Sequence, residues 1–131
     1  MSVIEEIAAR VEEWKGQNVV IDQLSGGLTN TNYKITVNGK PYFVRVPGAS
    51  TELLAIDRNN EYHNTSAAAT AGVAPKVLQH FPEYHVMVIE FLDGKTMSKD
   101  SLNAAGMPTR MAHAIKKLHA GPRFLTDFNM F

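Results

Sequence analysis

A turn rich in glycine is the first feature of the sequence that could carry chemistry. The pair Gly26-Gly27 lies between Ser25 and Thr29-Asn30. Because glycine has no Cβ, successive backbone amides there can approach a ligand and point toward phosphate oxygens. Ser25, Thr29 and Asn30 add side-chain donors. Alone, such a turn is more often a plain hairpin connection, so it indicates a phosphate site only in combination with other features.

A cation within an apolar segment is the second feature. Arg45 stands among the apolar residues of segment 42–46, where burying an unpaired guanidinium would cost on the order of several kcal/mol. Glu61, in a segment expected to be helical, can supply the anion, and a bidentate pair would leave other donors for a phosphate. The alternative is an arginine that reaches solvent at a sheet edge and a glutamate on a solvated helix face.

The third feature is the segment 88–94, which reads Val-Ile-Glu-Phe-Leu-Asp-Gly. An apolar strand that ends in a polar connector offers free backbone amide and carbonyl groups to the edge of a planar heterocycle. Alone, a strand running into a turn is the simpler interpretation. The three features indicate a binding site only if the secondary-structure elements bring them together.

Hydrophobic periodicity predicts those elements. Ser2 and Glu5 have the spacing of a capping box, and apolar residues at helical spacing predict a helix over 4–14. Short β-branched or alternating segments predict strands over 18–24, 31–37, 42–46, 76–81 and 85–92. Asn38-Gly39 is typical of a two-residue hairpin turn. A second helix should begin at Asp57 and end at Gly72.

This order predicts an α+β fold: a five-stranded antiparallel sheet crossed by one helix, with another helix in front of it. Two further helices are expected over 98–103 and 109–119. The apolar, aromatic end of the sequence at Phe131 is unusual for a complete domain. We therefore expect the chain to be truncated, with the helix over 109–119 packed on a partner or folded back on the sheet.

The composition excludes several classes of protein. The 131 residues hold 13 basic and 13 acidic side chains, and a general nucleic-acid binder needs a net basic face. The absence of cysteine excludes disulfides, thiolate nucleophiles and cysteine zinc sites. The most apolar stretch, 86–92, is far too short to span a bilayer. We expect no nucleic-acid or membrane partner and a cytoplasmic location.

The order of glycine-rich turn, strand cation, helix acid and polar connector is that of a kinase-type amino-terminal lobe. With its neighbouring residues, the chain strongly resembles the choline/ethanolamine kinase family, which belongs to the aminoglycoside-phosphotransferase-like branch of the kinase fold. The resemblance extends from Leu24 to Phe131. The segments that carry it are 44–48, 51–61, 72–78, 90–94 and 117–124.

The resemblance implies a phosphotransferase that moves the γ-phosphoryl group of ATP to the hydroxyl of choline or ethanolamine, with Mg²⁺ as cofactor. The turn of Ser25, Gly26, Gly27, Thr29 and Asn30 would cover the phosphates, with Ser25 and Asn30 as the main side-chain contacts.

Two further sets of contacts follow from the resemblance. Arg45 would contact the phosphates and pair with Glu61. The Glu90 carbonyl and the Leu92 amide would hold the adenine edge. The apolar walls of the adenine site would be Ile89 and either Phe43 or Val44.

The sequence departs from this family in one respect. None of its five histidines is followed two residues later by aspartate, so the family's catalytic loop is absent, as is the later magnesium-binding aspartate. The resemblance then implies a kinase-like amino-terminal lobe over 1–92, and a hinge with the start of a truncated carboxy-terminal lobe over 93–131. Such a chain holds no catalytic residue, binds ATP weakly or undetectably and shows no turnover by itself.

Two alternatives stay open. One is another small-molecule kinase of the same fold, acting on an aminoglycoside, thiamine or a sugar. The other is a non-catalytic nucleotide-binding or interaction module that ends near residue 131. In that case, the apolar stripe of the last helix would form a homo-oligomer or partner interface.

Overall fold

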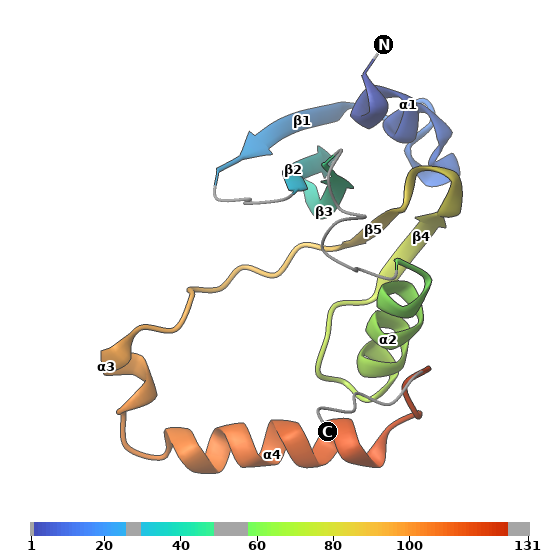
Figure 1. Ribbon diagram of the computed structural model, residues 1–131. Helices are drawn as coiled ribbons and strands as arrows, with labels where there is room; N and C mark the ends of the chain where they lie inside the picture. Colours follow the sequence, from blue (N-terminus) through green and yellow to red (C-terminus); the bar gives the residue numbers. More distant parts are fainter. Residues whose placement is uncertain (1, 26–29, 49–57, 126–131) are drawn as a thin grey trace.

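The computed structural model describes residues 2–25, 30–48 and 58–125, drawn as ribbon in Figure 1. The elements follow one another as α1 (Val3–Arg10), η1 (Glu12–Trp14), β1 (Val19–Leu24), β2 (Asn30–Val37), β3 (Lys40–Pro47), α2 (Arg58–Thr70), β4 (Val77–Phe81), η3 (Pro82–Tyr84), β5 (Val86–Glu90), α3 (Lys99–Leu102) and α4 (Met107–Ala120).

The strands form one antiparallel sheet in the order β1-β2-β3-β5-β4. This confirms the predicted α+β fold with a five-stranded sheet. The β2–β3 hairpin turns at Asn38 and Gly39, whose φ angles are +51° and +82°. Positive φ at both positions matches the right-handed twist of the two strands.

One face of the sheet carries the hydrophobic core. Ile4, Ile7, Val11 and Trp14 pack against side chains from four strands, and the Trp14 ring lies 5.1 Å from that of Tyr42. The buried strand residues are Ile35, Val37, Tyr42, Val44, Phe81, Val86 and Val88.

The first helix is shorter than its periodicity predicted. The capping box of Ser2 and Glu5 is confirmed, but the helix ends at Arg10, and Val11 is extended with φ −71° and ψ 111°. A separate 3₁₀ turn then carries Trp14 into the core. The helical prediction was wrong over 11–14, because burial of Val11 and Trp14 determines the backbone there more strongly than helix propensity does.

Among the described residues, α2 covers part of the other face of the sheet. Helix α2 lies beside β4, where the rings of Tyr62 and His80 stack 4.0 Å apart (Figure 1). Its predicted end is confirmed: Gly72 has a φ of +84°, and the amides of Gly72 and Val73 bond back to the carbonyls of Ala69 and Ala68, a Schellman cap. The predicted N-cap, Asp57, lies outside the described residues.

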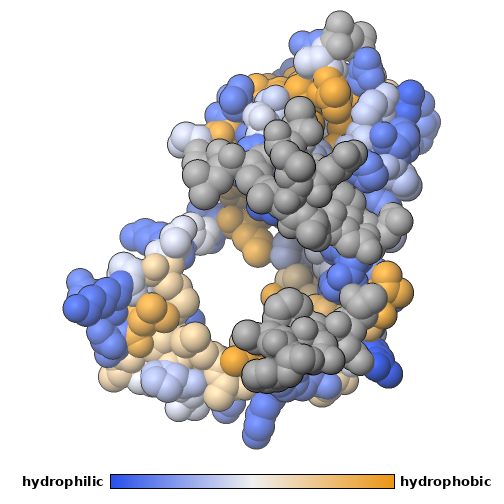
Figure 2. All heavy atoms as spheres, viewed as in Figure 1, coloured by the Kyte–Doolittle hydropathy of each residue, from blue (hydrophilic) through white to orange (hydrophobic). Residues whose placement is uncertain are grey.

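The chain after β5 leaves the sheet. The predicted helix over 98–103 is present as α3, with Ser98 as its N-cap. Helix α4 begins two residues before the predicted segment 109–119 and ends one residue after it. No residue of α4 is buried, and Figure 2 shows an opening between this part of the chain and the sheet. In the described part of the chain, the end of α4 approaches the end of α2 and not the sheet. Of the two expected arrangements, folding back on the sheet is therefore not the one observed, and packing on a partner stays a prediction.

The end of α4 and the residues that follow it lie close to α2. A Cβ at Gly121 would lie 2.5 Å from the Cβ of Ala71. The His63 ring contacts the carbonyl oxygen of Arg123 at 3.2 Å, and the Leu125 amide donates to the Asn64 side chain at 3.1 Å. Within the described segments, no helix has the length and apolar character needed to cross a membrane.

Candidate functional site

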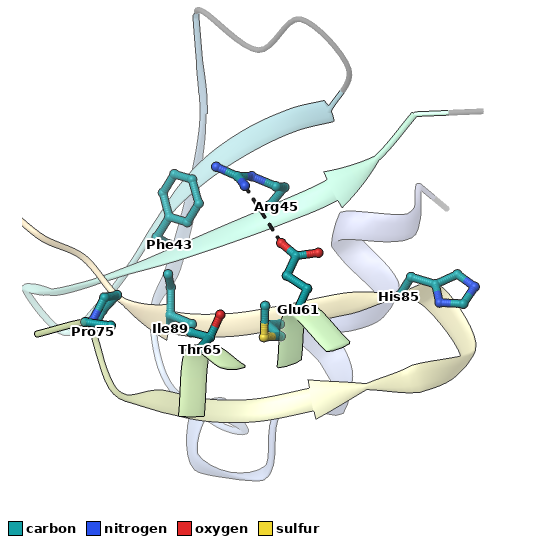
Figure 3. Close-up of a pocket in the computed structure, with 9 residues that line it drawn as sticks. Phe43, Arg45, Glu61, Thr65, Pro75, His85 and Ile89 are labelled. Atoms are coloured by element: carbon teal, nitrogen blue, oxygen red, sulfur yellow. Dashed lines mark ion pairs between the residues drawn. The ribbon is translucent and has the colours of Figure 1, made fainter. Parts of the chain in front are cut away.

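A cavity of about 250 Å³ lies between the partly covered sheet face and α2 (Figure 3). Its charged residues are Arg45 on β3 and Glu61 on α2, and most of its other lining is apolar. The full lining is Phe43, Arg45, Glu61, Thr65, Ala74, Pro75, His85, Met87 and Ile89.

Strand alternation places these side chains together. On β3, Phe43 and Arg45 line the cavity, while Val44 is buried in the core on the opposite face. The antiparallel register sets Ile89 opposite Phe43, so both side chains lie on the cavity face. Of the two residues considered as an apolar wall, Phe43 therefore lines the cavity with Ile89, and Val44 does not.

The guanidinium of Arg45 is held from two elements. Its Nη1 lies 3.9 Å from Oε1 of Glu61, and its Nε donates to Oδ1 of Asn32 on β2 at 3.3 Å. The predicted pairing with Glu61 is thus present as an ion pair, but as a single long contact and not a bidentate one. The Arg45 side chain is 46% exposed. The guanidinium is therefore partly solvated and not buried, because α2, at the β4 side, is the element that covers this face among the described residues.

The end of β5 is tied to the segment in front of β4. The Lys76 amide donates to the Glu90 carboxylate at 2.8 Å, and the Glu90 amide donates to the Lys76 carbonyl at 3.0 Å. Leu92 is 66% exposed, and none of the described residues accepts a hydrogen bond from its amide. Lys34 Nζ lies 4.8 Å above the Phe91 ring, which connects β2 to this segment.

The glycine-rich turn is described only at its ends. Ser25 follows β1 and is exposed, and Asn30 begins β2. Gly26, Gly27 and Thr29 lie outside the described residues. Leu24 pairs with Asn32, so the two ends of the turn leave the strands next to the pair of Asn32 and Arg45.

Sequence reasoning missed several residues that line the cavity or contact its lining. Asn32 contacts Arg45, and Thr65 lies one helical turn after Glu61 on α2. Met87 lies opposite Arg45 on β5. Each has a signal in the sequence. Met87 lies two residues before Ile89 and therefore shares its strand face, and Thr65 lies one helical turn after Glu61. The register of the predicted hairpin sets Asn32 opposite Arg45. The lining residue His85, with a φ of +54°, has no such signal.

Behind the cavity, α2 rests on a titratable side chain. His80 on β4 stacks on Tyr62, the neighbour of Glu61, with the two ring planes inclined by 11°. Burial lowers the pKa of His80, opposed in part by the Glu83 carboxylate and assisted by His85. The neutral ring is therefore the form that supports α2 near neutral pH.

Comparison with known proteins places this arrangement in a family. Residues 21–121 match the family model described as choline/ethanolamine kinase. No curated protein matches the chain. Several solved structures are similar to it.

A choline/ethanolamine kinase family protein from Mesorhizobium loti is 32% identical with a TM-score of 0.73, over 96% of this chain and 40% of that one. Choline kinase LicA from Streptococcus pneumoniae is 29% identical, with a TM-score of 0.56, over 71% of this chain and 32% of that one. LicA in complex with AMP is 23% identical, with a TM-score of 0.72, over 98% of this chain and 46% of that one.

This chain thus spans less than half the length of each of these proteins. The family model, in contrast, covers most of it, including Arg45, Glu61 and the end of β5. The chain belongs to the choline/ethanolamine kinase family.

Proposed function

We propose that this chain is the nucleotide-binding part of an ATP-dependent kinase that phosphorylates choline or ethanolamine. The observation that carries the proposal is the Arg45–Glu61 ion pair at the side of a cavity with mainly apolar walls. A guanidinium that is partly exposed beside such a cavity suits a ligand with a flat apolar part and an anionic part.

The two ends of the cavity suggest the direction of the bound nucleotide. The adenine ring would lie at the end formed by Phe43 and Ile89, with its edge on the Glu90 carbonyl and the Leu92 amide. The phosphates would then extend toward Arg45 and the turn that begins at Ser25. A structurally similar protein, LicA, was crystallised with AMP, which is in keeping with a nucleotide site in this fold.

The reaction in this proposal is a phosphoryl transfer. The hydroxyl oxygen of the amino alcohol bonds to the γ-phosphorus of ATP, the bond from that phosphorus to the bridging oxygen breaks, and the hydroxyl proton is released. Catalysis of this kind rests on positioning and charge stabilisation. Arg45 would hold phosphate oxygens, and Glu61 would hold Arg45.

In this proposal, the magnesium ligands lie outside the described residues. Among them, no group of three His, Asp or Glu side chains gathers closely enough to hold a metal ion. In this proposal, residues 1–92 form the amino-terminal lobe and 93–131 the hinge and first helices of a second lobe. Catalytic residues and Mg²⁺ ligands belong to further parts of a full-length cytoplasmic protein, so the 131 residues alone bind ATP weakly and show no turnover.

A coupled kinase assay of the full-length protein tests the proposal. We expect ATP-dependent phosphorylation of choline or ethanolamine. Turnover with thiamine, an aminoglycoside or a sugar alone would leave the kinase fold in place but refute the amino-alcohol acceptor.

A specific observation favours one competing candidate, an interaction module. The large apolar side chains of Leu102, Met111 and Ile115 on α3 and α4 are at least 42% exposed, and Figure 2 shows apolar surface along this part of the molecule. This surface would suit a homo-oligomer contact. Reading the source gene past Phe131 separates the two: an in-frame His-x-Asp segment supports the kinase, and a stop codon supports the module.

A further inference from the structure

The proposed function assigns no role to Asn32, although this residue lies beside Arg45. In the β2–β3 ladder it stands directly opposite Arg45. Cross-strand partners of an antiparallel pair point to the same face of the sheet, so Asn32 lies on the cavity face beside the arginine. Its Oδ1 accepts a hydrogen bond from Arg45 Nε at 3.3 Å.

The contact with Glu61 alone would hold Arg45 poorly. The distance of 3.9 Å from Nη1 to Oε1 is long, and an ion pair between partly exposed side chains contributes little. An arginine side chain also loses much rotamer freedom when it is fixed in one geometry. A second anchor is therefore needed if the guanidinium is to keep one orientation before a ligand arrives.

Asn32 and Glu61 contact different nitrogens of the guanidinium. Asn32 occupies Nε and Glu61 faces Nη1, so the plane of the group is fixed from β2 and from α2. No acceptor among the described residues contacts Nη2. An arginine fixed at two nitrogens can offer its remaining N–H groups to phosphate oxygens with little further loss of entropy.

We propose that Asn32 is a positioning residue that orients Arg45 toward the phosphates of the bound nucleotide. This inference rests on the proposed function, because it needs Arg45 to contact phosphate. Asn32 itself need not contact the nucleotide. Its effect on nucleotide affinity should pass entirely through Arg45.

A double-mutant cycle in the full-length protein tests this dependence. Equilibrium affinities for ATP and for adenosine are measured for Asn32→Ala, Arg45→Ala and the double variant, with Thr36→Ala as a control farther along the same face of β2. We expect Asn32→Ala to weaken ATP binding about tenfold, as expected for losing a hydrogen bond to a charged group, and to leave adenosine binding unchanged. The double variant should bind ATP no more weakly than Arg45→Ala.

The outcomes separate the inference from the proposed function. If Arg45→Ala weakens ATP binding but Asn32→Ala does not, or if the two effects multiply in the double variant, the positioning role is refuted and the proposed function stands. If Arg45→Ala leaves ATP binding unchanged, the proposed function fails and the inference fails with it.

A second measurement does not depend on nucleotide binding. The exchange of the Arg45 Nε proton with water, followed by NMR, should be faster in Asn32→Ala and unchanged in Thr36→Ala. Equal exchange in the parent protein and in Asn32→Ala would show that the hydrogen bond does not hold the guanidinium, and would overturn the inference by itself.

Discussion

The ring of Tyr62 on α2 stacks on the ring of His80 on β4, with centroids 4.0 Å apart and planes inclined by 11°. Tyr62 is the chain neighbour of Glu61, whose carboxylate faces Arg45. The stack therefore fixes the height of α2 over the sheet at the point where the ion pair forms. The geometry of the candidate site depends on a contact outside the cavity.

Removing the stacked ring should loosen α2. We expect Tyr62→Ala to lower the free energy of unfolding by about 1 kcal/mol more than Tyr62→Phe, because phenylalanine keeps the stacked pair and alanine does not. Urea unfolding of the two variants measures this difference. Equal stabilities would mean that the stack contributes nothing to the docking of α2.

The lowered pKa of His80 makes the stability depend on pH. In the unfolded chain the imidazole titrates at its ordinary value of 6.5, and burial lowers the pKa of His80 in the folded chain. The unfolded state therefore takes up the proton first as the pH falls. The contribution of the neutral His80 ring to the free energy of unfolding is fully present above pH 6.5 and is lost as the pH falls through the pKa of His80 in the folded chain.

A variant without the His80 imidazole isolates this effect. We expect His80→Phe, which keeps an aromatic ring under Tyr62, to lose less stability than the parent chain between neutral and mildly acidic pH. Chemical unfolding at a series of pH values measures the difference. Parallel pH profiles for the two proteins would contradict the assignment to His80.

The ionisation of Tyr84 should lower the stability of the fold at alkaline pH, whereas that of His80 lowers it at acidic pH. Its hydroxyl donates to Glu6 on α1 at 2.8 Å, and this hydrogen bond is the main reason why the pKa of Tyr84 is raised above 10.0. The stabilisation is present below the unfolded pKa and is lost as the pH rises through the folded pKa. We expect Tyr84→Phe to remove this alkaline loss, as followed by circular dichroism. An unchanged alkaline transition would contradict it.

Gly121 tests the contact between α4 and α2. A Cβ there would overlap with Ala71 at 2.5 Å, so Gly121→Ala should destabilise this packing by about 1–3 kcal/mol. Gly94→Ala is the matched control, because a Cβ at Gly94 meets no atom within 4 Å. Hydrogen exchange in the last turns of α2 and α4 reports the change. Equal protection in both variants would show that the two helices do not meet as described.

Much of the sheet was predictable, because alternation and the Asn38-Gly39 turn act locally. The same turn also fixes the register: Asn32 lies six residues before Asn38, and Arg45 lies six residues after Gly39. Their pairing therefore followed from the predicted hairpin. Asn32 lies within an alternating strand segment next to the glycine-rich turn, and its residue type alone does not mark it as a site residue.

The features that could not be predicted depend on which elements cover which face. Nothing local distinguishes a strand face covered by α1 from one beside α2, so the sequence left open whether Arg45 is buried or reaches solvent. The end of α1 at Arg10 depends on the burial of Trp14 against Tyr42, a contact between residues far apart in the sequence. Propensity alone does not register such contacts.

A structure of the full-length protein with a non-hydrolysable ATP analogue tests the central claim most directly. We expect a guanidinium nitrogen of Arg45 within hydrogen-bond distance of a phosphate oxygen, roughly 3 Å, with the adenine ring at the end of the cavity formed by Phe43 and Ile89. An analogue bound elsewhere, or bound here with Arg45 turned to solvent and no phosphate near it, would contradict the account.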